Sequence, residues 1–258
     1  MRVRGVVGPC DDVRKLEVCL ELVLGSCSEI GVFLKRIVIA IDGPSGSGKS
    51  TVARELAARL GYSFVESGAM YRAVALLALE KHVSLNDGEA LGKLAARAGI
   101  RFVPHASGNR LFLGDRDVTE AVRSTEVTEA SSRVSVHAAV RQELVARQRA
   151  LGRDGGVVME GRDIGTKVFP DADLKIFLDA SPEIRSERRF RDIAGSGEIT
   201  QVRVQQEMAE RDRRDRERDL SPLVPAADSI YIDTSHLAIN EVVERILALV
   251  KDKSEPRA

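Results

Sequence analysis

The segment Gly43–Ser50 reads GPSGSGKS, in which three glycines, a lysine and a serine stand at fixed spacing. This spacing matches the phosphate-binding pattern G-x-x-x-x-G-K-[ST]. In such a loop, backbone N–H groups surround phosphate oxygens, the lysine contacts the β- and γ-phosphates, and the final hydroxyl ligates Mg²⁺. The sequence therefore predicts that Lys49 is catalytic and that Ser50 holds Mg²⁺. The predicted ATP-binding residues of the loop are Gly43, Pro44, Ser45, Gly46, Ser47, Gly48, Lys49, Ser50 and Thr51.

The residues on either side of this loop have the patterns of a strand and a helix. Ile37–Ile41 is a nearly continuous apolar run, as expected of a parallel strand that is covered on both faces. An amphipathic helical pattern follows the loop and ends at Gly61. A glycine-rich turn that only connects a strand to a helix is the alternative, and the strand–loop–helix context argues against it.

A second candidate anion site follows the next predicted strand, which ends near Glu66. Ser67, Tyr71 and Arg72 open an Ala/Leu-rich helix, where a serine and an arginine can bind an anion. A capping serine and a solvated arginine would give the same pattern. The chain has neither the Asn-Lys-x-Asp segment of GTPases nor the Ser-Gly-Gly signature of ABC ATPases. A kinase of a small acceptor is the class that remains.

Two further apolar strands end in charged groups. Val157–Met159 leads into EGRD at residues 160–163, and Leu174–Leu178 leads to Ser181 and Pro182, which predict a helix start. Ligands of open α/β sheets bind beyond the carboxyl ends of the strands, so we expect these charged groups at the site. The helix after Pro182 carries Arg185, Arg188 and Arg189, and a fifth strand and a closing helix complete the pattern.

Residues 210–219 read ERDRRDRERD and contain only charged side chains, with five arginines against five carboxylates. This balance argues against a polyanion-binding tail. On a helix, Arg211, Asp215 and Arg218 share one face, whereas Arg213 and Arg216 point elsewhere. A wholly solvated helix is the alternative if the block is considered alone. Beside a phosphate-binding loop, we expect the face with Arg211 to meet nucleotides.

These motifs together resemble the cytidylate kinases of the nucleoside monophosphate kinase family. The resemblance extends from about Arg36 to Lys251 and rests on IDGPSGSGKST, SGAMYR, EGRDIGTKVFPDA, KIFLDAS and ERDRRDR with PLVPAAD, in that order. It implies an α/β P-loop kinase fold, a five-stranded parallel sheet with helices on both faces. It also implies a lid at about residues 185–218 and an acceptor-binding arm at about 67–141. The arm would include a small β-rich insert at about 99–123, with two β-like runs joined by a turn at 105–109.

The resemblance also implies residue roles. Arg162, Arg188 and Arg218 would join Lys49 in catalysis, and Arg188 and Arg189 would contact ATP. The implied CMP site consists of Ser67, Arg72, Arg162 and Arg218 at the phosphate, Ser132, Arg141 and Asp163 at cytosine, Arg211 and Asp215 at the ribose, and Tyr71. The chemistry agrees, because the cytosine amino group suits a carboxylate acceptor and its O2 and N3 suit an arginine donor. Glu160 departs from the Asp of many members, which leaves its role near the metal open.

The implied reaction is the ATP-dependent phosphorylation of CMP and dCMP, with Mg²⁺ as cofactor. A nucleoside monophosphate kinase for another base is one alternative. A non-catalytic P-loop module that binds nucleotide or RNA is another, although the chain has no Trp and no aromatic-rich basic strand of the kind that binds RNA.

Composition narrows the setting. Lys plus Arg equals Asp plus Glu at 39 each, so no net field steers the chain to nucleic acid or membrane. Cys10, Cys19 and Cys27 form neither a disulfide framework nor a zinc pattern, which predicts a cytoplasmic protein, and we expect a monomer. Glu17 and Glu21 interrupt a secretory-like apolar stretch in residues 1–35, which argues against a targeting signal, and we expect this segment to be a mobile extension or sequence upstream of the natural start. Residues 252–258 are expected to be a polar tail.

Overall fold

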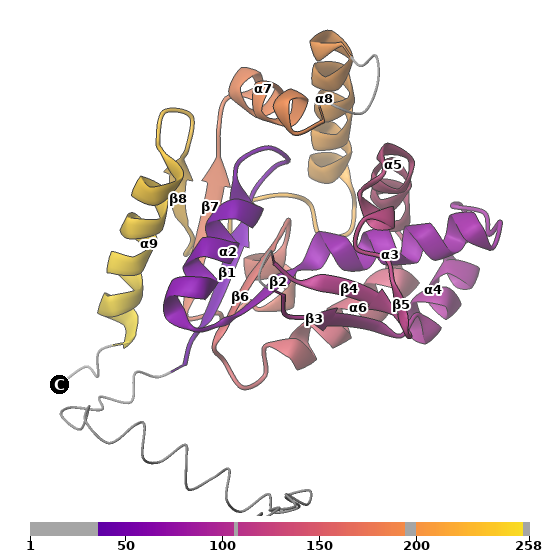
Figure 1. Cartoon of the computed structure of the whole chain (residues 1–258), viewed down its shortest axis with the longest axis horizontal. Helices are drawn as coiled ribbons and strands as arrows, with labels where there is room; N and C mark the ends of the chain where they lie inside the picture. The colour runs from indigo at the N-terminus through magenta and orange to yellow at the C-terminus, as the bar shows by residue number, and fades with distance from the viewer. Residues whose placement is uncertain (1–35, 106–107, 194–199, 255–258) are drawn as a thin grey trace, which may run out of the picture. The chain divides into compact units, whose positions relative to one another are not determined.

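The computed structural model describes residues 36–105, 108–193 and 200–254. Within them, a five-stranded sheet has the order β2-β6-β1-β7-β8, and all neighbouring strands are parallel (Figure 1). The strands are Val38–Asp42 (β1), Ser63–Glu66 (β2), Val157–Gly161 (β6), Leu174–Asp179 (β7) and Ile230–Asp233 (β8). The predicted α/β fold with five parallel strands is therefore confirmed. Predictions for residues 1–35 and for the tail beyond 254 lie outside the described residues.

Strand β1 lies at the centre of this sheet because both of its faces are apolar. Ile39 and Ile41 are fully buried in one core, together with residues of helices α2 (Lys49–Leu60) and α9 (Ile239–Ser254). Ala40, which points to the other face, belongs to a second core with Met159. Helix α9 continues three residues past 251, into the segment that was expected to be a polar tail. Basic residues in its last turn suit the negative end of a helix.

The predicted acceptor-binding arm is helical and carries a small antiparallel sheet. Its helices are Ser67–Glu80 (α3), Gly88–Arg97 (α4), Thr125–Val134 (α5) and Ala138–Leu151 (α6). Its strands are Ile100–Val103 (β3), Arg110–Leu113 (β4) and Arg116–Asp117 (β5). Strands β3 and β4 are the two predicted β-like runs, and β5 is a third strand that the sequence pattern did not indicate.

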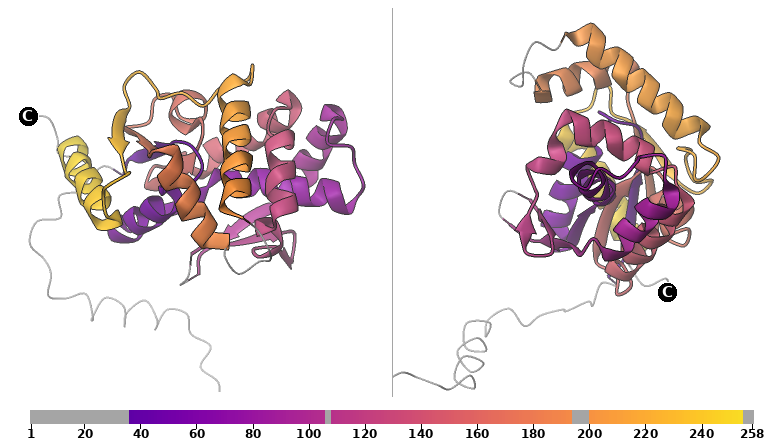
Figure 2. Two further views of the ribbon diagram at one scale, coloured as in Figure 1. Left: turned by 90° about the horizontal axis from the view of Figure 1, so that it is seen from above. Right: turned by 90° about the vertical axis from the view of Figure 1, so that its right-hand side faces the viewer.

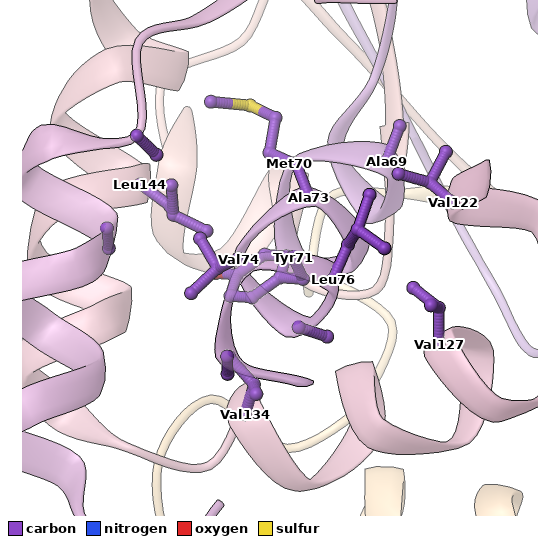
Figure 3. Close-up of a cluster of buried hydrophobic side chains, with 14 of the residues drawn as sticks. Ala69, Met70, Tyr71, Ala73, Val74, Leu76, Val122, Val127, Val134 and Leu144 are labelled. Carbon is purple, nitrogen blue, oxygen red and sulfur yellow. The ribbon is translucent and has the colours of Figure 1, made fainter. Parts of the chain in front are cut away.

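Helix α3 is held in place by an apolar core of its own. Met70 and Val74 are at most 1% exposed and belong to one cluster with Leu144 of α6 and Val127 of α5 (Figure 3). Because these contacts surround α3, they fix the orientation of its first turn. That turn carries Ser67, the first of the predicted phosphate-binding residues of the arm.

Two helices beyond the carboxyl end of β7 lie in the segment that is predicted to be a lid, and we call them the lid helices. They are Pro182–Ile193 (α7) and Gln201–Glu217 (α8) (Figure 1). The predicted cap is present, since Ser181 Oγ accepts from the Ile184 N–H at 3.4 Å. Figure 2 shows α8 alongside α5 of the arm, and the two helices contact each other. In the described part of the chain, no helix combines the length and the apolar character of a membrane span.

Candidate active site

The phosphate-binding loop takes a shape that requires glycine. Gly43 has a φ of +147°, and a Cβ atom there would lie 1.9 Å from the Leu178 carbonyl oxygen of β7. Gly48, at the N-cap of α2, has a φ of +89° and no side-chain capping bond to the first turn of the helix. The helix therefore begins with N–H groups that no side chain caps, and these groups can bind an anion.

Lys49 lies inside this loop. It is 5% exposed, and its Nζ donates to the Pro44 carbonyl at 2.6 Å and to Ser47 Oγ at 3.5 Å. Burial, followed by the charge of Arg162, lowers the pKa of Lys49, whereas the Glu160 carboxylate opposes that shift. An anion in the loop would stabilise the charged lysine further. A phosphate bound in the loop would thus lie next to the Lys49 ammonium group.

Ser50 and Glu160 meet beside Lys49. The Ser50 hydroxyl donates to Glu160 Oε1 at 3.0 Å, across the carboxyl ends of two neighbouring strands. Burial raises the pKa of Glu160, and Lys49 is the strongest opposing influence. The glutamate that departs from the family's usual aspartate therefore still reaches the predicted metal-binding hydroxyl.

Four arginines converge on the cleft between loop, arm and lid. The positive charges of Arg162, Arg72 and Arg189 act on the guanidinium group of Arg211 in α8. Burial, followed by Arg162, lowers the pKa of Arg211 to about 10. Its Nε is buried and has no hydrogen-bond partner among the described residues. A cluster of partly desolvated cations of this kind is suited to a polyanionic ligand.

Acidic groups hold this cluster in position. Arg162 Nε donates to Asp215 Oδ2 at 2.9 Å. Burial alone would raise the pKa of Asp215, but Arg162, Arg211 and Arg218 together lower it. Arg72 likewise pairs with Glu66 at the end of β2.

Ser67 lies close to the end of β6 that carries this cluster. A Cβ atom at Gly161 would lie 2.5 Å from Ser67 Oγ. Glycine at position 161 therefore allows the hydroxyl to approach the turn that bears Arg162.

The predicted base-reading residues are also brought together. Asp163 Oδ2 accepts from Arg141, whose guanidinium lies 5.8 Å from the centroid of the Tyr71 ring. Arg218 Nη2 lies 3.7 Å from the other carboxylate oxygen of Asp163. Asp163 and Arg141 are both 6% exposed, so their hydrogen-bonding groups are shielded from water.

A cavity of about 300 Å³ separates α5, α8 and the phosphate-binding loop. The predicted site residues that line it are Ser45, Ser132, Arg189 and Arg211. The Ser132 hydroxyl is buried and has no hydrogen-bond partner in the described part of the chain. The cavity thus has polar groups from both the ATP side and the CMP side of the predicted site.

Arg188 lies at the loop after β8, next to the phosphate-binding loop. Arg188 donates to Thr234 Oγ1 at 3.1 Å and to the Thr234 carbonyl at 2.7 Å, in the loop after β8. It lies beside the phosphate-binding loop, because Thr234 Oγ1 donates to the Ser47 carbonyl at 3.0 Å. The structure does not bring Arg188 into contact with the arginine cluster.

Arg218 lies past the end of α8, with extended backbone at φ −65° and ψ 136°. Its N–H still donates to the Arg214 carbonyl at 3.1 Å and its φ is helical, so its side chain leaves the backbone on the face that carries Arg211 and Asp215. The chain then turns, and the Leu223 N–H donates to the Asp215 carbonyl at 2.7 Å. The turn redirects the chain only after Arg218, whose side chain lies near Asp163.

Asp42 is a site residue that the sequence analysis missed. Its carboxylate accepts from the Ile164 N–H at 2.8 Å and the Gly165 N–H at 2.7 Å, directly after Asp163. Burial raises the pKa of Asp42 to about 7, against those hydrogen bonds and Lys49. The signal was present, because Asp42 ends an apolar strand just before Gly43. The strand-end argument used for residues 160–163 applies equally to it.

Comparison with known proteins agrees with this geometry. Residues 39–252 match the family model described as cytidylate kinase. The chain belongs to the cytidylate kinase family. A cytidylate kinase of Pelotomaculum thermopropionicum is 52% identical over 82% of this chain and 95% of its own length. Those of Exiguobacterium sibiricum and Bacillus subtilis are 49% and 45% identical, over 84% and 85% of this chain and 98% and 99% of their own lengths.

Membership of the cytidylate kinase family explains why these motifs follow one another in this order. The loop at Gly43, the first turn of α3, the end of β6 and the lid helices are distant in sequence, yet all lie inside the matched range. The first 35 residues lie outside it. The family match and the arginine cluster thus rest on the same part of the chain.

Proposed function

We propose that this cytidylate kinase family member transfers the γ-phosphoryl group of ATP to the 5′-phosphate of CMP or dCMP. The observation that carries the proposal is the arrangement of Arg162 and Arg211 beside Lys49. These cations face the same cleft as the Asp163–Arg141 pair, whose chemistry suits cytosine. The donor loop and the base-reading pair are joined by one turn, which runs from Glu160 to Asp163.

In the proposed reaction, an oxygen of the acceptor phosphate attacks the γ-phosphorus. The bond from that phosphorus to the β–γ bridging oxygen breaks, and ADP leaves with the electron pair. Negative charge spreads over the transferred group, so the protein contributes mainly positioning and positive charge. Lys49 and the loop N–H groups hold the donor, while Arg72, Arg162 and Arg218 hold the acceptor.

The residues present fit Mg²⁺. Ser50 Oγ and the buried Glu160 carboxylate lie 3.0 Å apart next to Lys49. Within the described residues, no group of three or more His, Cys, Asp or Glu side chains could enclose a metal ion. This suits Mg²⁺ that binds mainly to phosphates and water, with Ser50 as the proposed direct ligand and Glu160 oriented toward it. Bound Mg²⁺ would supply neutralisation of the charge on the β- and γ-phosphates.

The lid helices are proposed to exclude water. Arg211 and Asp215 reach the cleft from α8, so closure would bring them to the ribose as the phosphates are enclosed. Such closure limits hydrolysis of ATP by water. A cytoplasmic location and a monomeric state remain predictions.

The proposed function is tested by the substrates that the chain accepts. In a coupled assay of ADP formation, we expect kcat/KM for CMP and dCMP to exceed the values for UMP and AMP about tenfold or more. Higher activity with UMP or AMP would assign the chain to another base. Binding of nucleotide without ADP formation from any monophosphate would support the non-catalytic module instead.

Base selection is proposed to rest on Asp163, so Asp163→Ala should raise KM for CMP and narrow the gap between CMP and UMP. The loss of one buried acceptor is worth about 1–3 kcal/mol. Asp163→Asn keeps one acceptor oxygen, so its CMP-to-UMP ratio of kcat/KM should lie between those of the unmodified protein and Asp163→Ala. The measurement is kcat/KM with CMP and UMP for the three proteins. An unchanged CMP-to-UMP ratio in Asp163→Ala would place base reading elsewhere.

A further inference from the structure

Arg185 of α7 joins three parts of the active site through one guanidinium group. Its Nε donates to the Ala180 carbonyl at 3.0 Å, just after β7. Its Nη1 donates to the Ser45 carbonyl of the phosphate-binding loop at 3.0 Å, and also to Asp212 Oδ2 of α8. Arg185 is 4% exposed. Its hydrogen bonds thus go to protein groups, which distinguishes it from Arg211.

The phosphate-binding loop packs directly on this residue. Gly46 has a φ of +76°, and a Cβ atom there would lie 2.7 Å from the Arg185 carbonyl oxygen and 3.0 Å from the Arg185 Cβ. The middle of the loop and the first turn of α7 are therefore in close contact. A shift of either one moves the other.

Asp212 provides the contact on the lid side. It is 6% exposed, and its Oδ1 is buried without a hydrogen-bond partner in the described part of the chain. Its negative charge also reaches Arg162, whose pKa it helps to raise against the effect of burial. Asp212 follows Arg211 directly, so any movement of Asp212 also moves Arg211, which lines the cavity.

A buried ion pair of this kind is weak evidence for stability. The desolvation of two charges can exceed their mutual attraction, and apolar replacements are often as stable. One oxygen of Asp212 also lacks a partner, which adds to the desolvation cost. What the pair supplies is a directional connection between the loop that holds ATP and the helix that carries Arg211.

We propose that Arg185 and Asp212 form a positioning pair for phosphoryl transfer, which sets α8 relative to the phosphate-binding loop. The inference rests on the proposed CMP kinase activity. When the pair is intact, Arg211 and Asp215 reach the nucleotides in register with Lys49. When it is broken, the chain still folds, and the two halves of the site lose their common alignment.

The first test is Asp212→Asn, which keeps the shape of the side chain and removes its charge. We expect kcat with ATP and CMP to fall about 10- to 100-fold, because a small misplacement of aligned groups has effects of this size. The melting temperature, measured alongside, should fall, because buried Arg185 keeps only Asp179, 3.7 Å away, as a carboxylate partner, so kcat is measured well below the unfolding range. Glu217→Gln is the matched control, since it makes the same change on an exposed face of α8 and should leave kcat unchanged. A folded Asp212→Asn protein with kcat and both KM values within twofold of the unmodified protein would overturn the proposal.

The second test separates a positioning pair from a purely structural one. Arg185→Lys keeps a positive charge but lacks the planar fork that reaches Ser45 and Asp212 together. We expect it to raise KM for ATP more than KM for CMP, because the loop contact is lost first. The double variant Arg185→Lys/Asp212→Asn should be about as active as the less active of the two single variants.

Independent, multiplying losses in the double variant would overturn the pairing, and so would a lower melting temperature with unchanged kinetic constants in both single variants. If Asp212→Asn does not fold, Arg185→Lys alone tests the proposal, by whether KM for ATP rises more than KM for CMP. Activity of the unmodified chain with CMP is measured first. Failure of the proposed function is thereby distinguished from failure of the pair.

Discussion

Lys49→Met is expected to reduce phosphoryl transfer by at least about 10³-fold, because the change removes the cation that meets the transferred phosphate. The fold should survive. Methionine has nearly the length of lysine and no charge, and the Lys49 side chain is already buried in the loop. The lost hydrogen bonds are those to Pro44 and Ser47, both inside the loop. The measurement is kcat in the coupled ADP assay, with circular dichroism and thermal unfolding on the same samples.

A buried lysine outside the site provides the control for this variant. Lys175 in β7 is 7% exposed and donates to Asp228 at 2.8 Å. Lys175→Met should therefore change the melting temperature only slightly, since the Asp228 side chain is 67% exposed and water replaces its partner, and keep kcat within a few-fold of the unmodified protein. Near-normal turnover by folded Lys49→Met, or an equal loss of kcat in both variants, would contradict the assignment of the phosphate-binding loop.

The main strands could be predicted because their residues are apolar in continuous runs. Ile37–Ile41 and Leu174–Leu178 overlap β1 and β7 closely, since central parallel strands are buried on both faces and need no alternation. Strand β5 has two residues, Arg116 and Asp117, and neither is apolar. It forms because β4 provides a pairing edge, which is a tertiary effect that no local pattern reports.

The base-reading pair came from the resemblance, and the structure shows why the residues alone did not identify it. Asp163 and Arg141 are 22 residues apart and meet because α6 packs against Ile164–Val168, the helical turn directly after Asp163. Arg188 is a similar case. The resemblance implied that it contacts ATP, and its contacts with Thr234, beside the phosphate-binding loop, depend on where the loop after β8 passes.

Buried polar residues were the hardest to predict. Asp212 lies in a block of ten charged residues, and nothing in the charge pattern singled it out. In the structure it is 6% exposed, because α7 provides Arg185 at that position. Helical spacing correctly separates the exposed Arg213 from Arg211, but it cannot say which neighbouring helix covers the remaining side.

The charged block predicts a contrast between the two sides of α8. Alanine at Arg211 or Arg218 should lower kcat/KM for CMP by about 10³-fold, whereas alanine at Arg213 or Arg216 should have at most about a fivefold effect. The structure gives the reason. Arg211 and Arg218 are partly buried near other site charges, while Arg213 is exposed and bonds Glu210 at 2.9 Å and Glu217 at 3.2 Å on its own helix. Arg216 is exposed as well.

Alanine at Arg211 and alanine at Arg218 should change different kinetic constants. Arg211 is proposed to meet the ribose, so its loss should act mainly through KM for CMP. Arg218 lies 3.7 Å from Asp163 and is proposed to meet the acceptor phosphate, so its loss should lower kcat as well. The four single variants are compared by steady-state kinetics at one ionic strength, because exposed charges are screened by salt and buried ones much less. Equal losses at all four positions would indicate a diffuse electrostatic surface, and no loss at any position would mean that α8 does not meet the nucleotides during turnover.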